Sequence, residues 1–185
     1  MKRIATLAAG VLVAISFSVS AAPAFSLSST DIPKDHRLTE NQVFQGFGCS
    51  GSNISPQLAW KNPPVGTKSY AITVYDPDAP TGSGWWHWTV VNIPADIHAI
   101  PTGAGDSAKT ELPAGAVQGR NDFGYSGFGG ACPPAGAKPH RYQFTVWALS
   151  TDKLPIDSNA SGALVGFMLN SNVIAKAELT ASYGR

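Results

Sequence analysis

Residues 76–88 read DPDAPTGSGWWHW, and this stretch decides the fold. The runs on either side, residues 70–75 and 89–93, are rich in β-branched and aromatic residues, which favour strands. The prolines and glycines between these runs predict a stiff loop joining the two strands. Since loops held by a sheet often display binding groups, we expect the two aspartates and the histidine to lie together at one end of a sheet.

The rest of the chain also reads mainly as short strands. The clearest strand, residues 142–149, is apolar on both faces and is expected inside a sheet. Frequent glycine and proline favour an all-β sandwich of one domain with one or two short helices. Further strands are predicted at residues 25–30, 41–44, 58–60 and 175–183, and a helix with one apolar, core-facing stripe is predicted from Ser161 onward.

The first residues have the pattern of a secretory signal peptide. Lys2 and Arg3 precede an apolar run, residues 4–17, and small residues follow up to Ala22. The apolar run is short for a membrane span, although a membrane anchor is the alternative interpretation. We predict a signal peptide at 1–21, with cleavage after Ala21 or alternatively after Ala24, and a domain at 22–185. The protein is therefore expected in the periplasm, or released from the cell, and not to span the membrane.

The charge and the cysteines narrow the possible classes of function and site further. The chain has 13 basic and 12 acidic residues, so it lacks the basic field that would attract nucleic acid. Cys49 and Cys132 are expected to form a disulfide in an oxidising compartment, worth about 3–4 kcal/mol for a loop of this size. Two free buried thiols are the alternative, and no Cys-x-x-Cys spacing favours zinc.

Two motifs carry a resemblance to a known family. Asp-Pro-Asp-Ala-Pro at 76–80 is followed by Trp-x-His at 85–87, and Cys132-Pro133-Pro134 is followed by His140-Arg141-Tyr142. In this order and separation they resemble the phosphatidylethanolamine-binding protein family, also called Raf-kinase-inhibitor-like proteins, and within it the exported bacterial YbcL-type branch. The resemblance implies a Greek-key-like β-sandwich without the C-terminal helix of mammalian members. Its tight loop suggests a cis bond between Ala79 and Pro80.

The resemblance also implies a binding site. Successive side chains of a strand point to opposite faces, so His140 and Tyr142 should face one way and Arg141 the other, toward a carboxylate. Members of the family bind phosphate-like head groups, which implies a pocket for a small phosphate-like or carboxylate anion and no cofactor. The glycine-rich wall, residues 115–131, is expected to add backbone N–H donors. The residues implied for the site are Asp76, Asp78, His87, Pro134, His140 and Tyr142.

Other functions remain open for this cluster. An aspartate beside a histidine can act as a general base in a phosphoester hydrolase, but no nucleophile motif accompanies it. The same residues could hold a metal, although the histidine spacing does not favour one. A protein-interaction or inhibitor module is the main alternative, with no target indicated, and the bacterial branch suggests a homodimer. We expect a binding protein and not an enzyme.

Overall fold

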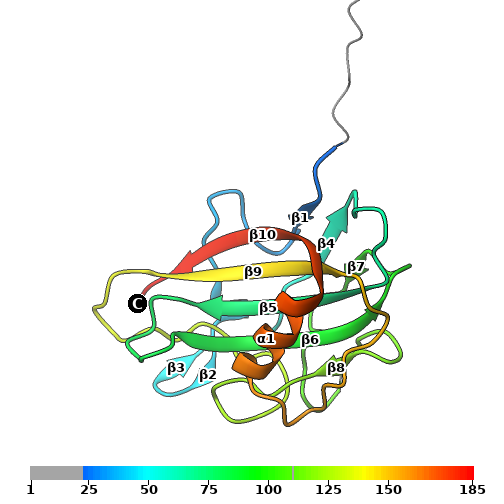
Figure 1. Ribbon diagram of the computed structural model, residues 1–185. Coiled ribbons are helices and arrows are strands. Elements are labelled where there is room, and N and C mark those ends of the chain that lie inside the picture. The colour runs from blue at the N-terminus through cyan, green and yellow to red at the C-terminus, as the bar shows by residue number, and fades with distance from the viewer. Residues whose placement is uncertain (1–22, 110) are drawn as a thin grey trace, which may run out of the picture.

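The computed structural model describes residues 23–109 and 111–185, so the predicted signal peptide lies outside the described residues. All strand pairings within the sheets are antiparallel. Figure 1 shows the longest strands side by side, with the one α-helix of the described residues lying across one face of their sheet. The elements are β1 Ser26–Ser28, the 3-10 helix Glu40–Gln42, β2 Gln45–Gly46, β3 Cys49–Ser50, β4 Leu58–Lys61, β5 Ser69–Asp76, β6 Trp85–Pro94, β7 Ala99–Ile100, β8 Val117–Gln118, β9 His140–Leu149, α1 Gly162–Asn172 and β10 Val173–Tyr183.

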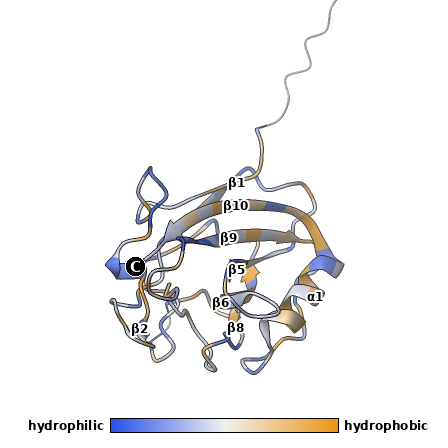
Figure 2. Ribbon diagram, turned by 90° about the vertical axis from the view of Figure 1, so that its left-hand side faces the viewer, coloured by the Kyte–Doolittle hydropathy of each residue, from blue (hydrophilic) through white to orange (hydrophobic). Residues whose placement is uncertain are grey.

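The main sheet has five strands in the order β10-β9-β5-β6-β8, and a smaller sheet has the order β1-β4-β7. A large apolar cluster includes Leu58 and Trp60 of β4, Ile72 of β5 and Phe144 of β9, so it joins the two sheets. In Figure 2, α1 and β2 lie on opposite sides of the main sheet. The predicted all-β class with a short helix is confirmed.

The interior strands are apolar on both faces because both faces are covered. In β9, Phe144 packs in the large cluster, whereas Trp147 packs in a second cluster with Val165 and Leu169 of α1. The side chain of Ser161 caps α1 by accepting a hydrogen bond from the Leu164 backbone N–H at 3.2 Å. This confirms the predicted interior strand and the predicted start of the helix.

Three local predictions were wrong. Residues 41–44 are not a strand, because the Gln42 side chain accepts hydrogen bonds from Thr39 and closes a 3-10 turn. The apolar stripe of α1 is only partly core, since Phe167 is exposed. The described residues contain no cis peptide bond, so the one suggested at Ala79-Pro80 is trans; there Thr81 N–H donates to the Ala79 carbonyl, closing the turn.

A disulfide joins Cys49 of β3 to Cys132, as predicted. It ties the small β2–β3 hairpin to the loop that contains Pro133 and Pro134. After β10, the Arg185 guanidinium donates hydrogen bonds to the carbonyls of Pro133 at 2.8 Å and Gly48 at 2.7 Å. The disulfide and Arg185 therefore hold the same two loops together.

Candidate functional site

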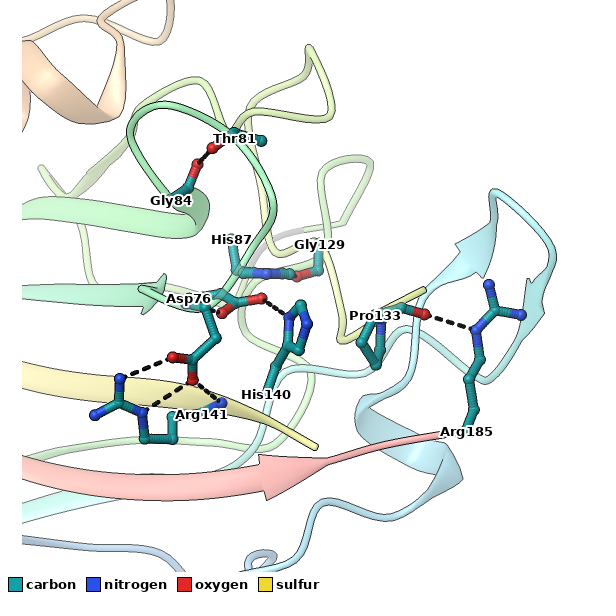
Figure 3. A network of polar contacts seen from close by, with 10 residues as sticks. Asp76, Thr81, Gly84, His87, Gly129, Pro133, His140, Arg141 and Arg185 are labelled. Atoms are coloured by element: carbon teal, nitrogen blue, oxygen red, sulfur yellow. Dashed lines mark hydrogen bonds and ion pairs between the residues drawn. The ribbon is translucent and has the colours of Figure 1, made fainter. Parts of the chain in front are cut away.

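The site lies where β5 ends and β6 and β9 begin. Because these neighbouring strands are antiparallel, the end of β5 lies beside the starts of both neighbours, and Asp76 pairs with Trp85 across the sheet. Figure 3 shows Asp76, His87 and His140 gathered at this end, with Pro133 of the disulfide-linked loop on the side of His140 away from Asp76. Two imidazoles from distant parts of the sequence are thus brought to one place.

These groups surround a hollow of about 190 Å³. It is lined by Asp76, His87, Pro134, His140 and Tyr142, which are five of the six residues that the resemblance implied. Trp85 also lines it. His36 and His98 are exposed and lie outside it. The other lining residues are Phe47, Ala79, Pro80, Thr81, Phe123, Cys132 and Pro133.

His140 and Asp76 form a buried pair that lines the hollow. The Nδ1 atom of His140 lies 2.8 Å from Oδ2 of Asp76 and donates its proton to that carboxylate. The other carboxylate oxygen, Oδ1, accepts the backbone N–H of Asp78 at 2.8 Å. Asp76 is 3% exposed, so both of its oxygens are held by protein donors in a region with little water. The orientation of the His140 ring is therefore fixed by Asp76.

His87 is held by the backbone instead of by a carboxylate. Its Nδ1 lies 2.7 Å from the Gly129 carbonyl oxygen, and since a carbonyl can only accept, Nδ1 carries the proton. Burial lowers the pKa of His87 below its ordinary value, while the carbonyl of Gly129 and the charge of Asp76 partly oppose this shift. In the neutral ring, Nε2 is then an acceptor; the Gly130 carbonyl also approaches the ring, but the only His87 side-chain hydrogen bond of good geometry in the described part of the chain is the one from Nδ1.

Tyr142 contributes a neutral hydroxyl. Burial raises the pKa of Tyr142 far above 10, and the nearby charge of Asp76 raises it further. The backbone N–H of Cys132 approaches the hydroxyl, but no hydrogen bond of good geometry forms within the residues described. A buried hydroxyl without a partner costs free energy, and this hydroxyl is closed off from water although the residue lines the hollow.

Asp78, the sixth implied residue, lies outside the hollow. Its carboxylate accepts Nε and Nη2 of Arg141 at 2.9 and 2.8 Å, and also the Arg141 backbone N–H. The hydrogen bonds from the Arg141 side chain lower the pKa of Asp78 to about 2. The predicted carboxylate partner of Arg141 is thus Asp78, which supports the loop from the outer face.

The glycine-rich wall has a different role from the predicted one. Gly129 N–H donates to the His87 carbonyl at 2.8 Å, and Gly130 N–H donates to Oδ1 of Asn53 at 2.7 Å. These N–H groups are therefore used within the protein and do not face a ligand. The wall supplies an acceptor, the Gly129 carbonyl, which fixes the tautomer of His87.

The sequence did not indicate the aromatic part of the hollow, formed by Phe47 and Phe123. Phe123 stacks on Phe44 with ring centroids 4.0 Å apart, and Phe47 lies 5.7 Å from Phe123. Trp85 meets Phe123 edge-on at 5.2 Å. The one available signal was the cysteine two residues after Phe47, because its partner Cys132 adjoins the proline pair.

The described residues show neither a metal-binding cluster nor a membrane-spanning helix. Among residues 23–109 and 111–185, no group of three or more His, Cys, Asp or Glu side chains is arranged to hold a metal ion. No helix in the same residues has the length and apolar character needed to span a membrane.

Comparison with known proteins shows the family of the chain. The model of the phosphatidylethanolamine-binding protein family matches residues 28–184. The chain belongs to this family. It is 65% identical over 173 residues to the UPF0098 protein YbcL of Escherichia coli (strain K12), covering 94% of each chain. It is 50% identical over 157 residues to YbhB of the same strain, covering 85% of this chain and 98% of YbhB.

A solved structure is also similar. The crystal structure of E. coli YbcL, described as a new member of the mammalian PEBP family, matches with a TM-score of 0.85 and 64% identity. The match covers 87% of this chain and 98% of that chain. The resemblance drawn from the two sequence motifs is therefore confirmed, both for the family and for its UPF0098 members.

Proposed function

We propose that this protein binds a small anionic group, phosphate-like or carboxylate, in the hollow between His87 and His140, without transforming it. The supporting observation is the state of the two rings. Each Nδ1 is already bonded to the protein, to Gly129 or to Asp76. For each Nε2, no hydrogen bond of good geometry to the protein is found among the described residues, and each ring lines the hollow. A site built for packing alone would not leave both nitrogens unused.

The charge of Asp76 decides how an anion can be accepted. A buried carboxylate repels a second anion, and a polar group between the two reduces this repulsion. His140 lies in this position, because it contacts Asp76 through one nitrogen and lines the hollow with the same ring. An anion also favours the protonated form of His87, which turns its Nε2 from an acceptor into a donor. Tyr142 lines the hollow as a neutral residue whose hydroxyl is buried.

Binding without catalysis fits the groups around the hollow. The hydroxyl of Thr81 donates to the Gly84 carbonyl at 2.6 Å, and Cys132 is in a disulfide. Neither group is prepared as a nucleophile by a neighbouring base. The remaining polar groups orient one another and suit recognition.

The proposed setting is the periplasm. A disulfide persists in an oxidising compartment, and the sequence of residues 1–21 has the pattern of a secretory signal peptide. Fractionation of cells expressing the full chain tests the setting. Mature protein in the periplasmic fraction is expected, and unprocessed protein in the cytoplasm contradicts it.

Titration calorimetry with phosphoethanolamine tests the binding. Wild-type protein is expected to bind, and His87→Ala is expected to lose at least about tenfold in affinity, because one of the two ring donors is lost. His98→Ala is the matched control, since His98 is exposed and lies outside the hollow. Absence of binding to the wild type, or equal loss in both variants, contradicts the proposal. Turnover of phosphoesters by the wild type, lost in His87→Ala, would make the protein a hydrolase instead.

A further inference from the structure

Phe47 is placed in a way that its own packing does not explain. It sits between β2 and β3, lines the hollow and is 71% exposed. Its φ of 50° lies in the left-handed region, which bulky residues rarely adopt and which costs free energy. An exposed aromatic ring in an unfavourable backbone conformation gains little for folding, so another contribution is expected at this position.

The surrounding structure fixes Phe47 at the mouth of the hollow. Two residues further along, Cys49 is bonded to Cys132, which itself lines the hollow. The carbonyl of Gly48, the next residue, accepts Nη1 of Arg185 at 2.7 Å. The ring also lies 5.8 Å from that of Phe44. The hairpin is therefore attached to the rim by a covalent bond and by a charged hydrogen bond.

The hollow consequently has two chemically different parts. The polar part, which we call the floor, consists of Asp76, His87, His140 and Tyr142. The apolar part, which we call the collar, consists of Phe47, Phe123 and Trp85. His87 joins the two parts, since its ring lies 5.5 Å from Phe123 and 5.1 Å from Tyr142. A bare inorganic anion would use the floor and leave the collar in water.

We propose that the ligand carries a flat apolar group beside its anionic group, and that Phe47 is a specificity-determining residue for that group. This inference rests on the proposed anion binding. The volume of about 190 Å³ is below the roughly 300–1,000 Å³ of pockets for drug-sized molecules. It suits a ligand with one anionic group and one ring, in which the anionic group contacts the floor while the ring contacts the collar. Aromatic rings meeting at the collar would stack on the ligand's flat face.

The test compares two probes that differ only in the apolar group, methyl phosphate and phenyl phosphate. Titration calorimetry on the full mature protein is expected to show phenyl phosphate binding about tenfold more tightly. In Phe47→Ala this ratio should fall toward one. Phe47→Asn serves as a second variant, because asparagine tolerates the left-handed backbone while removing the ring. Phe167→Ala is the matched control: Phe167 is 68% exposed but lies on α1, outside the hollow, so the ratio should be unchanged.

The outcomes separate the two proposals. Equal affinity of the wild type for both probes, or a ratio that both Phe47 variants retain, overturns the role of Phe47 while anion binding stands. A ratio that falls equally in Phe167→Ala also overturns it, since the effect would not come from the collar. Failure of the wild type to bind either probe overturns anion binding itself, and the inference with it.

Discussion

Asp76 and Asp78 stand two residues apart in one motif, yet they occupy opposite environments. Asp76 is buried, holds His140 and lines the hollow. Asp78 is at the surface and holds the side chain and backbone of Arg141. The alternation of β9 separates them, because His140 and Arg141 point to opposite faces of the sheet. The same residue type therefore orients a binding group on one face and supports the loop on the other.

The largest expected effect comes from replacing Asp76, with the same replacement at Asp78 as the comparison. Asp76→Ala leaves the buried His140 without its acceptor and should reduce the free energy of unfolding by about 3 kcal/mol and abolish anion binding. Asp78→Ala, the matched control, breaks a solvent-exposed pair and should change the melting temperature little and retain binding. Urea unfolding and calorimetry measure both effects. Equal effects of the two substitutions would remove the distinction between the two faces.

The second prediction concerns pH. Methyl sulfate, whose charge is constant between pH 5 and 8, should bind more tightly as the pH falls, by up to about tenfold per unit while one proton is taken up. The reason is that burial lowers the pKa of His87 in the free protein, and a bound anion favours the protonated ring. In His87→Gln the dependence should weaken. Affinity that does not change with pH would contradict proton uptake at the floor.

The lowered pKa of His87 should also affect stability: as the pH falls, the folded protein without anion should become less stable, whereas anion binding becomes tighter. Because the pKa of His87 is lower in the folded than in the unfolded chain, the unfolded chain takes up the proton first as the pH falls below about 6.5. The free energy of unfolding should therefore decrease below this pH without anion, and His87→Gln should reduce this decrease. Urea unfolding at several pH values measures it. A steeper decrease in the variant would contradict the assignment.

Tyr142→Phe should produce a smaller effect. Its hydroxyl is buried without a good hydrogen bond in the described protein, so its removal should leave the free energy of unfolding unchanged or raise it by up to about 1 kcal/mol. Affinity for methyl phosphate should be retained, because the hydroxyl is closed off from the hollow. Urea unfolding and calorimetry measure the two effects, and a clear loss of affinity would show instead that the hydroxyl donates to the anion.

The smallest effect is expected on the outer face. The Arg141 side chain keeps the pKa of Asp78 at about 2, so the pair should remain ionised until the pH falls well below 3.8. In Arg141→Ala, the Asp78 pKa should rise toward 3.8 while anion affinity is retained. Carboxyl chemical shifts followed by NMR across the acid range measure this. A change in anion affinity would mean that the two faces are not independent.

The sequence predicted the parts of the site that follow from regular strands. Alternation along β9 placed His140 and Tyr142 together, and the paired strands around residues 76–88 brought His87 to the same end. The sequence could not distinguish the role of Asp76 from that of Asp78, because both lie in the same proline-rich motif. Their partners, His140 and Arg141, are known only once β9 is placed beside them. Phe47 was missed because strands of two residues have no readable periodicity, and their place is fixed by the disulfide and by the hydrogen bond from Arg185.

The most direct test of the two-imidazole hollow is NMR of the ring nitrogens in protein labelled with ¹⁵N-histidine. Methyl phosphate should shift the Nε2 signals of His87 and His140 together, while each Nδ1 keeps its protein-bound proton and His98 is unaffected. Unchanged Nε2 signals at saturating methyl phosphate, or equal changes at His98, would contradict a shared anion site between the two rings.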